Sequence, residues 1–171
     1  MFTLILGGAA SGKSEYAESL ILRANILPRI YIATMEPLDG ECRARIERHR
    51  ALRAKKSFET VECYTALERL RLPGGAVLLE CMGNLVANEL YNSSGAGTDA
   101  ETKAEILRGV DSVLRQCREL VVVSNEVFSS GAGYKGDTLR YLKVLAAVNR
   151  TLAARADHVA EIVCGQAVYY K

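Results

Sequence analysis

Short apolar runs recur along the chain, separated by segments whose apolar residues follow helical spacing. The runs lie at residues 2–6, 29–34, 76–80, 119–126 and 158–163, with a shorter one near 59–62. Near-continuous apolar runs of this length are typical of parallel strands that are buried on both faces. Because helical segments lie between them, the pattern predicts an α/β protein with a mostly parallel sheet and helices on both faces.

The rest of the pattern predicts helices, loops and a terminal hairpin. Helices are expected at residues 14–24, 83–91 and 100–118, and Gly-rich loops at 92–99 and 129–137. Residues 158–163 and 166–171 flank Gly165, which predicts a C-terminal antiparallel hairpin. The sequence contains no internal repeat and no linker, so a single domain over residues 1–171 is expected.

The first apolar run leads into a phosphate-binding motif. The sequence GGAASGKS matches G-x-x-x-x-G-K-[ST] at every fixed position and lies between a predicted strand and a predicted helix. In this geometry, backbone N–H groups and the positive end of the helix dipole surround a phosphate. Lys13 is expected to reach the β- and γ-phosphates, and Ser14 to bind Mg²⁺. We therefore expect a P-loop NTPase fold, with the nucleotide held by Gly7, Gly8, Ala9, Ala10, Ser11, Gly12, Lys13 and Ser14.

Other candidate residues follow the other predicted strands. They are Ala33, Thr34 and Met35 after the second run, Glu80 at the end of 76–80, and Asn125 and Glu126 at the end of 119–126. Ligands of such sheets bind beyond the carboxyl ends of the strands, so these residues are expected near the phosphate loop. Glu80 is expected to hold Mg²⁺, directly or through water, and Glu126 is a second functional candidate.

Composition and missing motifs narrow the class of protein. The net charge of +2 is too small to favour a nucleic-acid partner. Five widely spaced cysteines without a C-x-x-C pair suggest neither a disulfide framework nor a zinc site. No signal peptide is recognised and no apolar run approaches the length of a membrane span, so a cytoplasmic protein is expected. The base-reading motif of GTPases, N-K-x-D, does not occur, and the chain length best suits a small-molecule kinase.

A basic segment at residues 41–56, expected to be helical, is not required by a plain kinase. His49 is spaced by three residues from Ile46 and from Leu52, which places it near the less polar side. Such a segment can be a solvated helix face with partners such as Glu47, or an RNA-binding helix, which the low net charge disfavours. Beside a phosphate loop, arginines can also hold a polyphosphate, and a neutral imidazole can attack phosphorus. The basic residues are Arg43, Arg45, Arg48, Arg50, Arg53, Lys55 and Lys56.

Over nearly its whole length the chain resembles the bifunctional adenosylcobinamide kinase / adenosylcobinamide-phosphate guanylyltransferase family of cobalamin biosynthesis. The resemblance rests on GGAASGKSEYAE, YIAT, ARIERHR, ETVEC, LLECMGNLVANELY, SNEV and VNRTLAARAD, in this order. It implies that a nucleoside triphosphate phosphorylates the aminopropanol hydroxyl of adenosylcobinamide. GMP from GTP would then be transferred to that phosphate through a covalent histidine intermediate.

The resemblance also implies site residues, ligands and an assembly. His49 corresponds to the histidine that carries GMP, with Lys13 as the second catalytic residue, and GTP, ATP and Mg²⁺ are the expected ligands. A corrinoid substrate and a homotrimer are implied as well. We expect Glu62 to accept hydrogen bonds from guanine. Further nucleotide contacts are implied for Gly7 to Ser14, Ala33, Thr34, Met35, Arg50, Ala51, Leu52, Arg53 and Glu80.

The segment after Glu126 departs from the family pattern. Phe128 stands where the family usually has glycine, and the proline that normally follows is missing, in a loop expected to meet the corrinoid. Two other functions therefore remain open at the level of sequence. One is a monofunctional P-loop kinase in which His49 is structural. The other is a nucleotide-binding regulatory module that uses the basic segment to bind a partner.

Overall fold

A seven-stranded sheet forms the centre of the protein, with the order β3-β2-β4-β5-β1-β6-β7. The computed structural model describes residues 1–37, 40, 43, 46–47, 50–51, 56–92, 97–129 and 133–171. Every pairing is parallel except that of β6 with β7. The strands are β1 Phe2–Gly7, β2 Arg29–Ala33, β3 Phe58–Glu62, β4 Ala76–Leu79, β5 Glu119–Asn125, β6 His158–Val163 and β7 Gln166–Tyr169. The predicted parallel sheet and terminal hairpin are therefore confirmed.

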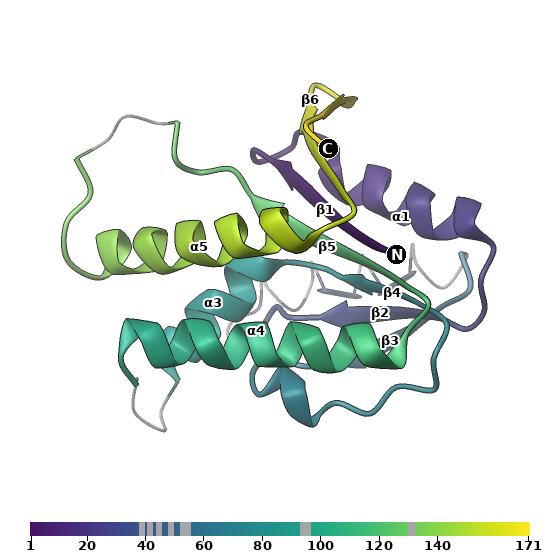
Figure 1. Ribbon diagram of the computed structural model, residues 1–171, viewed down its shortest axis with the longest axis horizontal. Coiled ribbons are helices and arrows are strands. Elements are labelled where there is room, and N and C mark those ends of the chain that lie inside the picture. The colour runs from purple at the N-terminus through teal and green to yellow at the C-terminus, as the bar shows by residue number, and fades with distance from the viewer. Residues whose placement is uncertain are drawn as a thin grey trace.

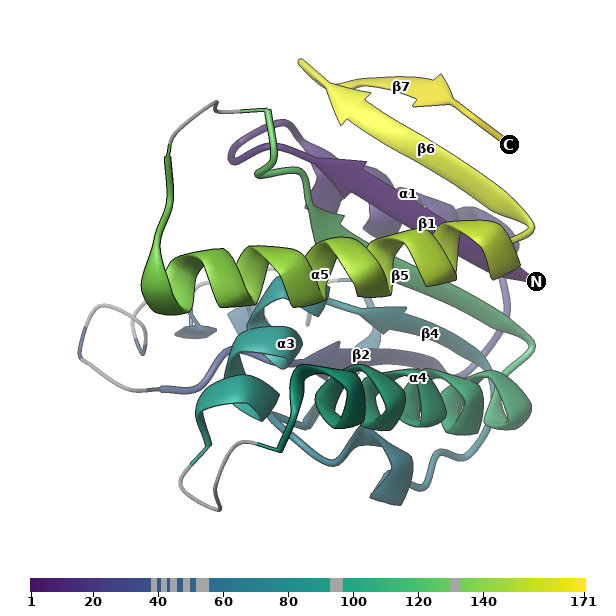
Figure 2. The ribbon, with the colours of Figure 1, turned by 60° about the vertical axis from the view of Figure 1, so that its left-hand side comes forward.

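Helices cover both faces of this sheet, as expected from the apolar strands. Helix α1 (Lys13–Ala24) lies on one face, whereas α3 (Met82–Tyr91), α4 (Asp99–Gln116) and α5 (Gly136–Arg155) lie on the other, as Figure 1 and Figure 2 show. Side chains that alternate along β1 enter two separate cores. Leu4 packs with the α3, α4 and α5 side, and Ile5 with the α1 side. Both are completely buried, and this explains why the strands read as continuous apolar runs.

The boundaries of several elements differ from the sequence-based expectation by a few residues. Helix α4 begins at Asp99 because Thr98 and Glu101 form a capping box, in which each side chain bonds the backbone N–H of the other residue. Helix α5 begins at Gly136, at the edge of the predicted loop 129–137. Of the expected basic helix, residues 43, 46–47, 50 and 51 are described and helical, and His49 lies outside the described residues. No helix in the described ranges is long and apolar enough to cross a membrane.

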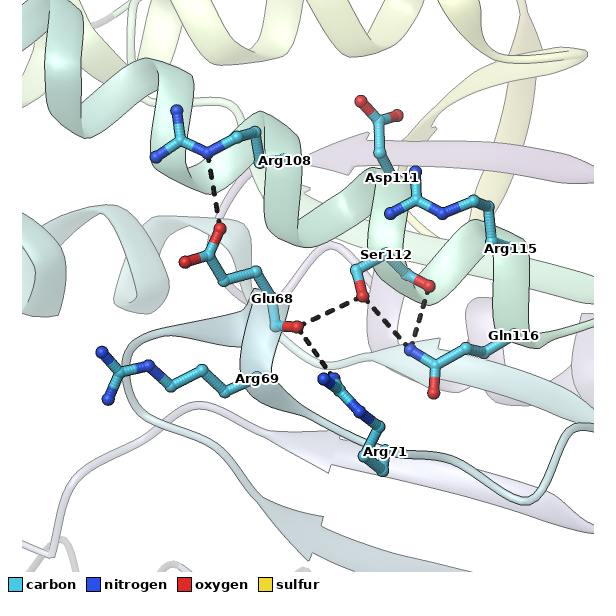
Figure 3. A pocket seen from close by; sticks show the side chains of 8 residues that line it. All are labelled: Glu68, Arg69, Arg71, Arg108, Asp111, Ser112, Arg115 and Gln116. Atoms are coloured by element: carbon cyan, nitrogen blue, oxygen red, sulfur yellow. Dashed lines mark hydrogen bonds and ion pairs between the residues drawn. The ribbon is translucent and has the colours of Figure 1, made fainter.

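A short 3-10 helix, η1 (Leu67–Arg69), packs against α4. The Ser112 hydroxyl donates to the Glu68 carbonyl at 3.3 Å, as Figure 3 shows. The Gln116 amide donates to the Leu70 carbonyl at 3.2 Å and accepts from the Leu72 N–H at 2.8 Å. The two elements approach closely at Gly109 of α4, where an added Cβ would lie 2.7 Å from the Cβ of Leu67.

This close approach predicts that Gly109→Ala destabilises the protein. Helix propensity alone would favour alanine by about 1 kcal/mol. We expect the overpacking against Leu67 to dominate and to lower the free energy of unfolding by about 1–3 kcal/mol. Urea denaturation measures this, with the exposed Arg115→Ala on the same helix as control, which should stay within about 0.5 kcal/mol of the parent protein. A Gly109→Ala protein as stable as the parent would contradict the argument.

Candidate nucleotide-binding site

The glycine-rich motif forms a wrapped loop between β1 and α1. Gly12 precedes α1 with a φ of 90°, in the left-handed region that favours glycine. Within the loop, the Ser11 N–H donates to the Gly8 carbonyl at 3.3 Å. The Lys13 ammonium group also donates to this carbonyl, at 2.9 Å. The lysine is therefore folded over the loop, where it can meet the phosphates that the backbone N–H groups would bind.

Neighbouring strands fix the shape of the loop. The Glu126 N–H, just beyond β5, donates to the Gly7 carbonyl at 3.0 Å, and the Gly165 N–H donates to the Ser11 carbonyl at 2.9 Å. Gly7 has no room for a side chain, because an added Cβ would lie 2.5 Å from the Ser11 Oγ and 2.9 Å from the Ile162 carbonyl oxygen. The loop is thus held from both neighbours of β1, and the turn of the terminal hairpin supports it directly.

A cavity of about 590 Å³ opens over the loop. It brings six residues of the motif together with Met35 and Glu80, which follow β2 and β4, as the sequence predicts for the carboxyl edge of the sheet. Gly7 and Gly8 are not among the residues that line it. The lining residues are Ala9, Ala10, Ser11, Gly12, Lys13, Ser14, Glu15, Met35, Glu80, Cys81, Asn84, Asn125 and Val127.

Glu80 is positioned by the end of β2. Its carboxylate accepts a hydrogen bond from the Thr34 N–H at 3.3 Å. The Thr34 hydroxyl donates to the Cys81 carbonyl at 2.9 Å, and the Asn88 amide donates to the Thr34 carbonyl at 2.9 Å. Ala33 and Thr34 are buried, with 7% and 0% of their surface exposed. Thr34 therefore supports Glu80, and a direct contact of Ala33 or Thr34 with the nucleotide stays a prediction.

Mg²⁺ is compatible with the residues of this cavity. The Ser14 hydroxyl and the Glu80 carboxylate line the same hollow, and both offer oxygen donors. Magnesium in nucleotide sites is usually held by one or two such groups together with phosphates and waters. Among the described residues there is no group of three or more His, Cys, Asp or Glu side chains that would form a separate metal cage. The donors therefore suit a metal that is bound with the nucleotide.

Cys81 and Asn84 are cavity residues that the sequence analysis did not select. Cys81 precedes α3, its sulfur accepts from the Asn84 N–H at 3.4 Å, and the Asn125 amide contacts it at 3.7 Å. Burial raises the pKa of the Cys81 thiol, so it is neutral at physiological pH and acts as a packing and hydrogen-bonding group. Their position directly after Glu80, at a strand end and a helix start, is the signal that could have identified them.

Glu62, which is expected to recognise guanine, lies elsewhere on the sheet edge. Glu62 ends β3, forms an ion pair with Arg50, and accepts from the Tyr64 hydroxyl at 2.9 Å. Neither Glu62 nor Arg50 lines the cavity over the phosphate loop. Strand β3 lies four positions from β1 in the sheet, a separation of roughly 19 Å at about 4.8 Å per strand. Ala51 is described and exposed, and the predicted site residues His49, Leu52 and Arg53 lie outside the described residues.

Another hollow, of about 770 Å³, lies between η1 and α4 (Figure 3). One of its arginines, Arg108, pairs with Glu68, whereas Asp111 pairs with Arg155, which does not line the hollow. Arg71 donates to the Glu68 and Leu70 carbonyls. None of the predicted site residues that the structure describes lines this hollow, and we assign it no part in nucleotide binding. Its lining residues are Glu68, Arg69, Arg71, Arg108, Asp111, Ser112, Arg115 and Gln116.

The parallel sheet and the lysine-bearing loop between β1 and α1 define a P-loop nucleotide-binding protein. Residues 3–169 match the family described as cobinamide kinase / cobinamide phosphate guanyltransferase, and the chain belongs to this family. The resemblance inferred from the motifs is thereby confirmed.

Curated relatives match over their full length. The bifunctional adenosylcobalamin biosynthesis protein CobU of Salmonella typhimurium is 36% identical over 186 residues, covering 100% of both chains. The protein of the same name from Escherichia coli is 35% identical over 185 residues, again covering 100% of both. Among solved structures, the RadB recombinase aligns with a TM-score of 0.48 at 18% identity, over 94% of this chain and 73% of that one.

The position of Glu80 predicts a role in the binding of the magnesium–nucleotide complex. A substitution that keeps the hydrogen bond to Thr34 can test this role without changing the fold. Glu80→Gln keeps an oxygen that can accept from the Thr34 N–H but removes the charge. We expect the affinity for the magnesium–nucleotide complex to fall by about 10–100-fold, as for lost support of a metal site. Metal-free nucleotide binding should change much less. Calorimetric titrations with and without Mg²⁺ measure both affinities. Glu105→Gln, on α4 and away from the cavity, is the control, and equal losses with and without the metal would contradict the assignment.

Proposed function

We propose that the chain is a bifunctional enzyme of cobalamin biosynthesis, with adenosylcobinamide kinase and adenosylcobinamide-phosphate guanylyltransferase activities. The observation that carries the proposal is the full-length similarity to bifunctional relatives, together with a complete phosphate loop under an open cavity. The substrates are a nucleoside triphosphate, GTP or ATP, and a corrinoid. We further propose a cytoplasmic homotrimer that binds no nucleic acid, in keeping with the family resemblance and the net charge of +2.

The kinase step is a phosphoryl transfer at the loop. The aminopropanol hydroxyl oxygen forms a bond to the γ-phosphorus, the bond from this phosphorus to the β–γ bridging oxygen breaks, and the hydroxyl proton passes to water. Catalysis of this kind depends on positioning and on stabilisation of charge rather than on a covalent enzyme intermediate. Lys13 and the loop N–H groups neutralise the phosphates. Ser14 and Glu80 would hold Mg²⁺, which when bound supplies further charge neutralisation.

The guanylyl transfer proceeds in two displacements through His49. The imidazole nitrogen first forms a bond to the α-phosphorus of GTP, and pyrophosphate leaves with the bridging oxygen. A phosphate oxygen of the corrinoid phosphate then attacks this phosphorus, and the phosphorus–nitrogen bond breaks to regenerate the histidine. Covalent catalysis of this kind divides a difficult transfer into two easier ones. Arg50 and Arg53 are proposed nucleotide contacts on the same segment, with Ala51 and Leu52.

Glu62 is the proposed source of the preference for GTP. Its carboxylate already accepts from the Tyr64 hydroxyl and pairs with Arg50, so it is oriented before any ligand binds. An ionised carboxylate accepts hydrogen bonds from the N1–H and the N2 amine of guanine, whereas adenine lacks this donor pair. Arg50, which pairs with Glu62, belongs to the same segment as His49, so the proposed roles of these residues are linked.

Covalent labelling tests the guanylyltransferase. The protein is incubated with Mg²⁺ and GTP labelled at the α-phosphate or, separately, at the γ-phosphate, and is then denatured. We expect label to be retained only from the α-phosphate, to be stable to alkali and lost in acid, and to be absent in His49→Ala. Kinase activity should persist in His49→Ala, because γ-phosphoryl transfer needs no histidine intermediate. Absence of α-label despite demonstrated GTP binding would leave the monofunctional kinase or the regulatory module as the function.

The guanine contact makes a separate prediction about nucleotide selectivity. Glu62→Gln removes the charge that strengthens the two hydrogen bonds and introduces an amide NH2 donor where guanine also donates. We expect the GTP/ATP preference of the guanylylation step to fall about 10–100-fold, the value of charged hydrogen bonds of about 1.5–3 kcal/mol. Competition of unlabelled ATP against α-labelled GTP measures the ratio. Glu59→Gln on the same strand is the matched control, and an unchanged ratio in Glu62→Gln would rule out the contact.

A further inference from the structure

A small apolar hollow lies between α3 and the beginning of α5. Its volume is about 350 Å³, and its lining residues are Ala87, Tyr91, Asp137, Thr138 and Tyr141. Tyr91 is 47% exposed. The Tyr91 hydroxyl donates to the Asp137 carbonyl at 2.7 Å, which connects the end of α3 to the first turn of α5. This hydrogen bond joins the two helices at the hollow.

Tyr141 joins this hollow to the nucleotide cavity. Its hydroxyl lies 2.8 Å from the point that a Cβ on Gly83 would occupy, and the Asn125 amide nitrogen lies 2.8 Å from the same point. The Cys81 sulfur lies 3.6 Å from it. Asn125 and Cys81 both line the cavity over the phosphate loop, whereas Tyr141 lines the apolar hollow. The two spaces therefore meet at a shared wall above Gly83.

The surface of α3 continues from one space to the other. Asn84 lines the nucleotide cavity, and Ala87 and Tyr91 line the hollow. These residues are spaced by three and four positions, so they lie on one face of the helix. A ligand that lies along this face would have one end at the nucleotide and its body against aromatic rings. Burial raises the pKa of Tyr141 to about 12, so its hydroxyl stays protonated and can donate a hydrogen bond at physiological pH.

We propose that this hollow holds the hydroxyl-bearing arm of the phosphate acceptor, and that Tyr141 positions the arm toward the terminal phosphate of the nucleotide. The inference rests on the proposed kinase function and identifies where its second substrate binds. An acceptor must lie beside the reacting phosphate, and the hollow adjoins the cavity in which that phosphate is expected.

The side chains that line the hollow determine which kind of acceptor it can bind. Among the described residues, the lining includes one carboxylate, Asp137, and no lysine or arginine, so a phosphorylated or otherwise anionic acceptor is disfavoured. Tyrosine rings with polar tips suit a ligand that has an apolar body and a hydrogen-bonding end. A corrinoid with an aminopropanol arm has this character. Exposed apolar side chains also occur in the segment before α5 and in its first turn, at Phe128, Tyr134 and Leu139.

Two kinds of variant test the assignment in the full-length protein. Ala87→Trp fills the hollow, and we expect it to raise the KM for adenosylcobinamide at least about tenfold, which corresponds to about 1.4 kcal/mol. Its KM and Kd for the nucleotide should stay within about twofold, because Ala87 does not line the nucleotide cavity. Tyr141→Phe removes only the hydroxyl, and we expect it to lower kcat for phosphorylation by about tenfold, a typical value for one hydrogen bond. Ala154→Trp, on the exposed side of α5, is the matched control.

The outcomes separate this inference from the proposed function. If the parent protein binds nucleotide but transfers no phosphate to adenosylcobinamide, the proposed function is wrong. If the parent protein is active and Ala87→Trp has an unchanged KM for adenosylcobinamide, only the acceptor site is wrong. Should Ala87→Trp fail to fold in a thermal melt, Thr138→Trp fills the same hollow from an exposed position on α5 and decides the question by the same KM measurement. A loss shared by Ala154→Trp would also overturn the assignment.

Discussion

The parallel register of β1 between β5 and β6 is the constraint on which the site depends. It places Gly7 opposite Asn125 on one side and opposite Ile162 on the other. Both neighbours then hold the phosphate loop, because the Glu126 N–H binds the Gly7 carbonyl and the Gly165 N–H binds the Ser11 carbonyl. A slip of one residue in either pairing would remove these hydrogen bonds and turn the alternating side chains of β1 into the wrong cores. The buried strands therefore fix the loop before any nucleotide binds.

The motif-based part of the site could be predicted because its information is local. Gly7 to Ser14 carry the loop geometry within eight consecutive positions, and Glu80 follows from the rule that parallel strands present their carboxyl ends at one edge. The contribution of Tyr141 could not be predicted in this way. Tyr141 reaches the shared wall only because Gly83 leaves space for its hydroxyl and for Asn125, a coincidence of three distant segments. The spacing of residues along the chain does not reveal that Tyr141, Asn125 and Gly83 lie together.

The position of Glu62 in the sheet is a second feature that could not be predicted from the sequence. The order of motifs along the chain assigns Glu62 to the same nucleotide as the phosphate loop, but order in the sequence is not order in the sheet. Strand β3 is at the edge, and β2, β4 and β5 separate it from β1. Because each strand adds about 4.8 Å, the distance between the two candidate sites is set by topology rather than by side chains. Arg50, paired with Glu62, belongs to the segment whose other predicted residues lie largely outside the described chain.

The distance between Glu62 on β3 and the phosphate loop matters for how one chain can carry out both phosphoryl and guanylyl transfer. The kinase step needs an acceptor at the γ-phosphate, and the proposed acceptor hollow adjoins the phosphate-loop cavity through Tyr141 and Asn125. The proposed guanylyl step uses His49, and Arg50, which follows it in sequence, is paired at β3 with Glu62. The residues proposed for the two steps therefore include Tyr141 beside the phosphate loop and Glu62 at the distant strand β3. Under these proposed roles the corrinoid phosphate and the bound GMP must be brought together for the second transfer, since a group-transfer reaction requires its partners to be in contact.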